Sequence, residues 1–312
     1  MGEASKTSGE IGEKIAAKLL EEIGWKNSIK NISIKCTSSA HRNKNDKQVQ
    51  THGDDLVFIY DSPFHDDTTE VVHISVKNSV KEVKSPSGIV SDFKKHIKEL
   101  NDTIECATSN PEINEIIERF EAKRRIRHNG LLVWTHCGQN SLEANIRQHL
   151  SKIRIPDEII HPIYLIDNER ASFLIQTINH AKHKHTECDR KFYYPKIGTA
   201  IYDEQDRYGD HLPLELISSD IVPWKITKSN DAVEISIYAN QEFEKETYQK
   251  LMFYAYSFSA GISSSISLGT TNYNEAHHKH DADSCKLSFK GKTEKVIPFS
   301  FGSSFLSLLE QG

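Results

Sequence analysis

The amino-acid sequence predicts an α/β protein in which helices flank a mixed β-sheet, followed by a second, strand-rich α+β region. Three observations support this prediction. Residues 8–24 have the apolar spacing of an amphipathic helix, apolar strands then alternate with helices as far as residue 166, and the chain becomes irregular after about residue 168. The order expected for the first region is α-β-β-β-α-(α)-β-α-β.

The elements of the first region follow from local signals. In the helix over residues 8–24, Ile11, Ile15 and Leu19 fall at helical spacing, and Gly24 stands where a helix ends. Residues 37–53 are polar and without pattern, which indicates a loop. The other expected elements are strands over 29–36, 55–60, 69–77, 131–136 and 161–166, and helices over 89–106, 111–127 and 141–152.

The second region begins with a predicted helix, ASFLIQTINHAKHK, and continues through a stretch interrupted by proline and glycine. Apolar runs then predict strands over residues 232–240, 251–260, 286–291 and 295–301. We therefore expect two domains, residues 1–167 and residues 168–312.

Composition places the chain in a broad class. Its 312 residues are 37% hydrophobic and 27% charged, enough for a core without disulfides. The five cysteines are odd in number, widely spaced and without a CxxC pair, which favours reduced thiols in a cytoplasmic protein. No apolar leader and no membrane-length apolar run is found, so we expect neither export nor a membrane partner.

The segment over residues 52–79 carries the clearest chemical signal. It reads as two neighbouring strands, the first opening with Asp54 and Asp55. Ser75 and Lys77 lie on one face at the end of the second strand, because side chains alternate along a strand. Charged groups inside apolar strands are costly unless they are paired or used, so this hairpin is a candidate site.

A further carboxylate is expected from the first helix. Glu13 lies at the edge of the apolar stripe, whereas Glu10 points almost directly away from it. Glu13, Asp55 and Ser75 would supply oxygen ligands of the kind that select Mg²⁺ or Mn²⁺. Lys77 would orient a water molecule or stabilise the developing negative charge.

These segments resemble the PD-(D/E)XK, or restriction-endonuclease-like, nuclease superfamily over roughly residues 8–136. GEKIAAKLLEEIGW is similar to the opening helix, whose Gly-Glu supplies a metal-site acid, here Glu13. GDDLVFI is similar to the metal-binding aspartate segment, with Asp55 at the aspartate position and Asp54 as its neighbour. HISVK is similar to the (D/E)-X-K segment, with Lys77 as the lysine.

The resemblance implies a restriction-endonuclease-like core of order α-β-β-β-α-β and a metal-dependent nuclease. The metal ligands would be Glu13, Asp55, Ser75 and the carbonyl of Val76, with Lys77 as the catalytic lysine. DNA is favoured over RNA as the nucleic-acid partner, and phage defence or restriction is the natural setting. Such an enzyme calls for a controlling partner protein, within a homo- or hetero-oligomer, and residues 168–312 would serve recognition or assembly.

One residue departs from the family pattern. Ser75 stands where the family usually carries Glu, Asp or Gln, so the site holds one acid fewer. The alternative is therefore a catalytically inert subunit of the same fold that binds nucleic acid or a partner protein.

Two further features have competing interpretations. Basic residues near the second and third helices suit phosphate contacts, with solvated helix faces as the alternative. They are Lys84, Lys94, Lys95, Lys98, Arg124, Arg125 and Arg127. Histidine clusters over residues 180–188 and 277–285 offer zinc ligands, but their spacing favours exposed or nucleic-acid-facing helices over a zinc-binding adaptor.

Overall fold

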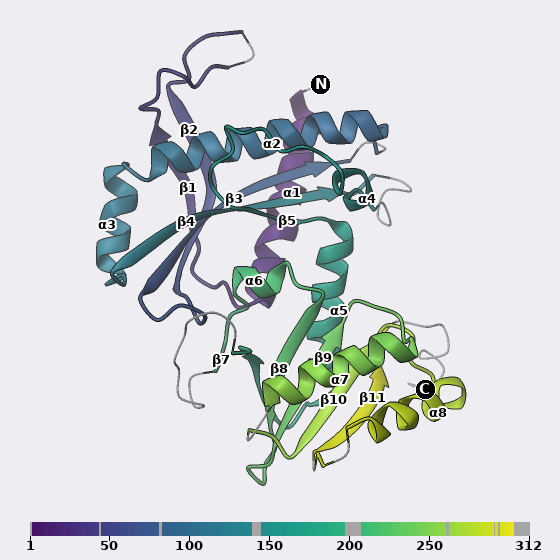
Figure 1. Cartoon of the computed structure of the whole chain (residues 1–312). Helices are drawn as coiled ribbons and strands as arrows, with labels where there is room; N and C mark the ends of the chain where they lie inside the picture. Colours follow the sequence, from purple (N-terminus) through teal and green to yellow (C-terminus); the bar gives the residue numbers. More distant parts are fainter. Residues whose placement is uncertain are drawn as a thin grey trace. The chain divides into compact units, whose positions relative to one another are not determined.

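The computed structural model describes residues 2–43, 45–80, 83–138, 145–196, 207–259, 262–289, 291–292 and 294–302. The chain divides into two compact units, Met1–Ser172 and Phe173–Gly312. Each unit contains one β-sheet with helices packed on it, and Figure 1 shows both. The fold class expected from the sequence is confirmed.

The first unit is built on a five-stranded sheet of order β1-β2-β3-β4-β5. The first three strands pair antiparallel, and β3, β4 and β5 pair parallel. The α-β-β-β-α-(α)-β-α-β order predicted from the sequence is confirmed. Its elements are α1 (Gly2–Glu22), β1 (Ile29–Lys35), β2 (Thr51–Asp61), β3 (Thr68–Ser79), α2 (Pro86–Ala107), α3 (Pro111–Arg119), β4 (Arg125–His136), α4 (Arg147–Leu150) and β5 (Ile163–Ile166).

Helices α1 and α2 pack on opposite faces of this sheet. A Cβ atom at Gly12 of α1 would clash with the Cβ of Asn78, so α1 approaches β3 closely there. The preceding residue, Lys77, has its ammonium 3.7 Å from a carboxylate oxygen of Glu99 on α2. Because consecutive strand residues point to opposite faces, Asn78 marks the α1 face and Lys77 marks the α2 face.

Several boundaries in this unit differ from the expected ones. The helix expected over 111–127 ends at Arg119, and β4 already begins at Arg125, because Arg125–Arg127 pair with Thr68–Glu70 of β3. The helix expected over 141–152 is described only as the short α4, and residues 139–144 lie outside the described residues.

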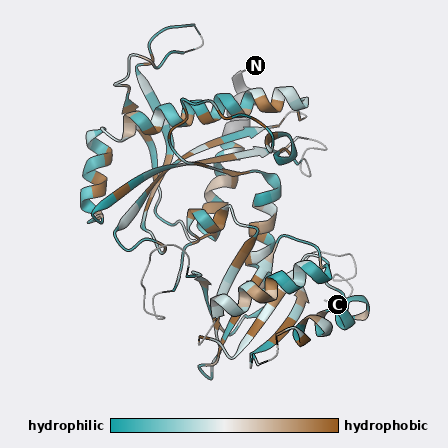
Figure 2. Cartoon of the chain, viewed as in Figure 1, coloured by the Kyte–Doolittle hydropathy of each residue, from teal (hydrophilic) through white to brown (hydrophobic). Residues whose placement is uncertain are grey.

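The second unit has a six-stranded sheet of order β11-β10-β9-β8-β6-β7. Strands β9, β10 and β11 are parallel, with α7 and α8 as their connections, and β8 pairs antiparallel with β9 and β6. Figure 2 shows hydrophobic residues concentrated along its strands. Its elements are α5 (Asn168–Lys184), β6 (Asp189–Tyr193), β7 (Tyr208–Gly209), α6 (Leu214–Ile217), β8 (Ile221–Thr227), β9 (Val233–Ala239), α7 (Lys245–Ser259), β10 (Ser265–Thr270), α8 (Glu275–Leu287) and β11 (Lys295–Ser300).

Two of the four strand predictions for this unit are wrong. Residues 251–259 belong to helix α7, and residues 286–289 lie at the end of α8 and in the turn after it. The strands expected over 232–240 and 295–301 are confirmed as β9 and β11. Among the described residues, the longest helices all fall short of the apolar character that a bilayer crossing requires.

Candidate active site

The candidate site lies where strands β2 and β3 separate. Their register runs from Asp61↔Thr69 to Leu56↔Ile74 and ends there. Every β3 residue up to Ile74 is buried, whereas the five residues after it are half-buried. At this point Asp55 turns its carboxylate toward the neighbouring strand and accepts a hydrogen bond from the backbone N–H of Val76 at 2.7 Å. The aspartate is thereby held beside Ser75 and Lys77.

Lys77 has an acidic neighbour that was not expected from the sequence. Its Nζ lies 3.7 Å from Glu99 Oε2, with one third of the lysine side chain and half of the glutamate exposed. The neighbouring His96 and the charges of Lys77 and Lys95 lower the pKa of Glu99 to about 2, so this carboxylate is ionised at neutral pH. In sequence, Glu99 reads as one half of a solvated i,i+4 pair with Lys95.

Glu13 is placed differently from its expected position. It is exposed on α1, as is Glu10. Its neighbour Gly12 abuts Asn78, so α1 covers the sheet face opposite to Lys77. The Asp55 carboxylate thus lies on the backbone N–H between Ser75 and Lys77, and Glu99 lies beside the Lys77 ammonium. Glu13 belongs to the helix on the other face.

Asp54 is a buried supporting residue. It is 2% exposed, and its Oδ2 lies 2.5 Å from Nδ1 of His73, whose Nε2 lies 3.0 Å from Nδ1 of His128. Burial raises the pKa of Asp54 despite the hydrogen bond from His73. This chain of hydrogen bonds anchors the backbone that carries Asp55. Of the two carboxylates, that of Asp55 is the more exposed.

The donor set fits a hard divalent cation. The Asp55 carboxylate, the Ser75 hydroxyl and the Val76 carbonyl are all oxygen donors on half-buried residues. Mg²⁺ prefers oxygen ligands and keeps several water molecules, so a site with few protein ligands suits it. Because this set contains only oxygen donors, it does not favour softer metal ions, which prefer nitrogen and sulfur ligands.

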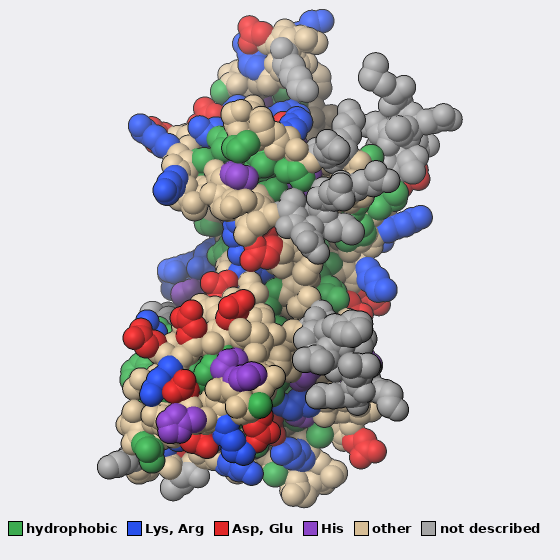
Figure 3. All heavy atoms as spheres, turned by 90° about the vertical axis from the view of Figure 1, so that its right-hand side faces the viewer, with side chains coloured by type: hydrophobic (Ala, Val, Ile, Leu, Met, Phe, Trp, Pro, Cys, Tyr) green, Lys and Arg blue, Asp and Glu red, His purple; other side chains and the backbone are tan. Residues whose placement is uncertain are grey.

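Four of the seven basic residues proposed for phosphate contacts have acidic partners in the structure. Arg127 is bound to the buried Glu70, which also accepts a hydrogen bond from Asn129 at 2.7 Å, so this arginine serves the fold. Lys84, Lys95 and Lys98 each have an acidic partner within 4 Å. On the face shown in Figure 3, basic and acidic side chains of the described residues are interspersed.

The two histidine clusters of the second unit do not form metal sites among the residues that the structure describes. His180 stacks on Phe299 and lies within hydrogen-bonding distance of the Tyr238 hydroxyl, at 3.0 Å. His277 is exposed on α8, whereas Cys285 is buried in the core.

Comparison with known proteins identifies a family. A family model described as the GAPS4 protein PD-(D/E)XK nuclease domain matches residues 1–170, which include the sheet, α1 and the candidate site. No curated protein and no solved structure matches the chain.

Proposed function

We propose that this chain, which belongs to the GAPS4 protein PD-(D/E)XK nuclease domain family, hydrolyses phosphodiester bonds of nucleic acid in a metal-dependent reaction, with DNA favoured over RNA. The observation that carries the proposal is the convergence of Asp55, Ser75 and Lys77 at the separation of β2 and β3. An accessible carboxylate beside a strand-end ammonium is the arrangement that phosphodiester hydrolysis needs.

The residues proposed to hold Mg²⁺ or Mn²⁺ are Asp55, Ser75 and the carbonyl of Val76. Glu13, the further ligand expected from the sequence, lies on α1, which covers the sheet face opposite to Lys77. When bound, such a cation supplies a water of lowered pKa and neutralises charge at the scissile phosphate. The backbone N–H of Val76 fixes one oxygen of Asp55, which orients the other away from that bond. The Ser75 hydroxyl can donate to a phosphate oxygen or to water, as a carboxylate in its place could not.

Lys77 and Glu99 are proposed to act together. Glu99 balances the ammonium of Lys77 and restricts its position before nucleic acid arrives. A phosphate oxygen that enters the site competes with Glu99 for the Lys77 ammonium. Lys77 can then stabilise the negative charge that develops on the phosphate in the transition state. Family members usually carry an acid where this chain has Ser75. Glu99 on α2 would supply a negative charge in its place.

The proposal also covers the second unit and the cellular role. A nuclease of this family endangers its own host, so we assign it to phage defence under the control of a partner protein, in the cytoplasm. Residues 168–312 would recognise that partner or the substrate, because they carry a sheet of their own and contribute none of the proposed site residues.

A cleavage assay tests the proposal directly. Wild-type protein is incubated with Mg²⁺ or Mn²⁺ and with single-stranded DNA, double-stranded DNA or RNA, and Asp55→Ala serves as the inactive variant. We expect metal-dependent cleavage by the wild type, strongest on DNA, and none by Asp55→Ala. The inert-subunit alternative, favoured by Ser75, predicts binding of nucleic acid without cleavage under every metal condition.

A further inference from the structure

Four potential metal ligands converge at a place remote from Lys77 in the sequence. Cys36 directly follows β1, His41 lies in the loop before β2, His52 is on β2, and Cys106 is near the end of α2. One ligand atom from each residue lies within 4.8 Å of all the others. His41, His52 and Cys106 are buried, and Cys36 is half-buried.

Four of the six separations among these atoms match a tetrahedron around one metal ion, and the other two are within 4.8 Å. With usual zinc–sulfur and zinc–nitrogen bonds, tetrahedral geometry gives edges of about 3.8 Å for S–S, about 3.5 Å for S–N and about 3.3 Å for N–N. Cys36 Sγ and Cys106 Sγ are 4.0 Å apart, and each lies 3.5 Å from Nδ1 of His41. Nδ1 of His41 and Nε2 of His52 are 3.2 Å apart.

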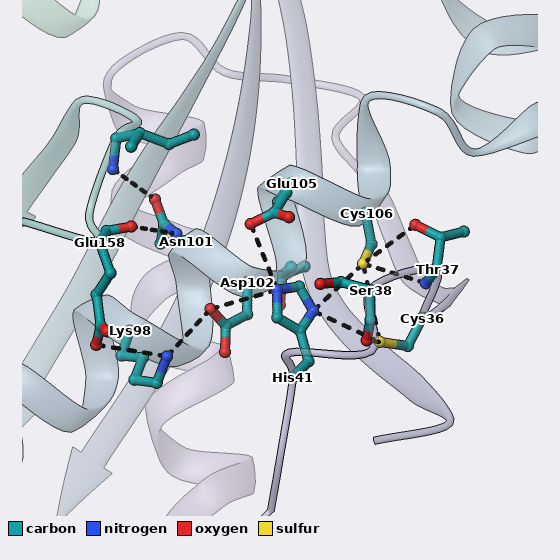
Figure 4. Close-up of polar contacts among 12 residues, drawn as sticks. Cys36, Thr37, Ser38, His41, Lys98, Asn101, Asp102, Glu105, Cys106 and Glu158 are labelled. Atoms are coloured by element: carbon teal, nitrogen blue, oxygen red, sulfur yellow. Dashed lines mark hydrogen bonds and ion pairs between the residues drawn. The ribbon is translucent and has the colours of Figure 1, made fainter. Parts of the chain in front are cut away.

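The surroundings supply the second layer of contacts that a metal site uses. The other nitrogen of His41, Nε2, lies 3.4 Å from Glu105 Oε2 and 3.7 Å from Asp102 Oδ1, as Figure 4 shows. An acidic partner of this kind fixes the ring so that Nδ1 presents its lone pair. Thr37 directs its backbone N–H and its hydroxyl at Cys106 Sγ, at 3.5 and 3.7 Å. Such donors stabilise a thiolate.

We propose that Cys36, His41, His52 and Cys106 bind one structural Zn²⁺ ion. Two sulfur and two nitrogen donors in a tetrahedron are the ligand set that selects zinc, and four protein ligands leave no open position for catalysis. Without a cation, these buried groups have only weak hydrogen bonds through thiol S–H donors to satisfy one another.

The proposed zinc connects the elements that carry the candidate active site. On β2, His52 precedes Asp55 by three residues, and on α2, Cys106 follows Glu99 by about two helical turns. The ion would also close the loop over residues 37–50, in which the Arg42↔Gln48 bridge forms a small hairpin. Metal binding therefore contributes to folding of the first unit.

Metal content of the purified full chain tests the proposal. We expect one zinc per chain by elemental analysis, and less than a tenth of that in Cys36→Ser, His52→Asn and Cys106→Ser. Cys188→Ser and His277→Asn, which alter the second unit, are the matched controls and should keep the full amount. Cobalt-substituted wild-type protein should show the thiolate-to-cobalt and visible bands of a tetrahedral site, a readout that needs no variant.

Three outcomes would overturn the proposal: wild-type protein without stoichiometric zinc, zinc retained after both cysteines are replaced, or a disulfide that removes two of the five cysteines from thiol titration. Zinc content is measured without any cleavage assay. A chain that binds zinc but cuts nothing would therefore leave this inference intact and count against the proposed nuclease alone.

Discussion

At the scale of single residues, Lys77 is held between two kinds of neighbour. Ser75 and the Asp55–Val76 contact lie beside it on the sheet, and Glu99 approaches it from α2. Binding of a metal needs oxygen atoms at suitable positions and does not depend on which element supplies them. The serine in the strand therefore does not by itself make the site inert.

Replacement of Lys77 should separate binding from chemistry. We expect Lys77→Ala to lower the cleavage rate by about 100- to 1000-fold, because the ammonium acts on charge that develops in the transition state. Lys77→Arg should be nearly as slow, since a guanidinium is a poor substitute for a compact ammonium. Single-turnover cleavage and filter binding measure the two effects. Equal losses of affinity and rate would show that Lys77 is only a phosphate contact.

The carboxylates can be ranked by a matched series. Glu99→Gln should lower activity by about 10- to 100-fold, with a higher Mg²⁺ requirement, because it removes the acidic partner of Lys77. Glu13→Gln should cost less, and Glu10→Gln should cost least. Cleavage rates across a Mg²⁺ titration give the ranking. Should Glu13→Gln prove the most damaging, the acid from α1 reaches the metal and Glu99 is a surface partner only.

Asp55 and Ser75 should differ in the size of their effects. Asp55→Ala is expected to abolish cleavage, whereas Ser75→Ala should keep part of it, because a hydroxyl is a weaker ligand than a carboxylate. Ser75→Glu should preserve or raise activity at limiting Mg²⁺ by restoring the acid usual in the family. Rates at low and saturating Mg²⁺ decide this. A Ser75→Ala variant as inactive as Asp55→Ala would assign the serine a role other than a metal ligand.

At the scale of secondary-structure elements, the close approach of α1 to β3 depends on Gly12. Gly12→Ala places a methyl group against Asn78 and should lower the free energy of unfolding by about 1–3 kcal/mol. Helix propensity alone would favour alanine by about 1 kcal/mol, so the sign of the change is informative. Gly53→Ala is the control, because nothing lies within 4 Å of its added Cβ. Urea denaturation measures both, and a stabilised Gly12→Ala would mean that the contact relaxes without cost.

The sequence predicted the elements with clear apolar periodicity. It failed where exposed apolar residues interrupt that periodicity. In α7, Leu251, Met252 and Ala255 are buried at helical spacing, but Phe253 and Tyr254 are exposed aromatic residues between them. The run therefore reads as a continuous apolar strand. Whether an aromatic residue faces solvent depends on packing, which no local pattern reveals.

Site residues were predictable only where they lie in one local segment. Asp55, Ser75 and Lys77 belong to neighbouring strands, so alternation places them together. Glu99 comes from a helix whose rotation relative to the sheet is set by core packing. The proposed zinc ligands are even harder to predict from the sequence, because Cys36 and Cys106 are 70 residues apart and belong to no CxxC pair.

At the scale of the whole molecule, both units bury histidines in the neutral form. Burial lowers the pKa of His128 to about 3 and, with help from Lys184, that of His180 to about 4. Burial also lowers the pKa of His211 to about 4. The ordinary value is 6.5, so between pH 6.5 and these values the unfolded chain binds more protons than the folded one.

Stability should therefore be greatest above pH 6.5 and should fall as the pH drops toward 4. Each site contributes at most about 1.4 kcal/mol per pH unit over that window. His180→Gln should flatten the slope, because its ring stacks on Phe299 and protonation would place a second cation beside Lys184, which lies over the same ring. His277→Gln, which changes an exposed histidine of α8, should leave the slope as in wild type. Thermal denaturation from pH 4 to pH 8 measures all three proteins, and an identical slope in His180→Gln would show that acid destabilisation arises elsewhere.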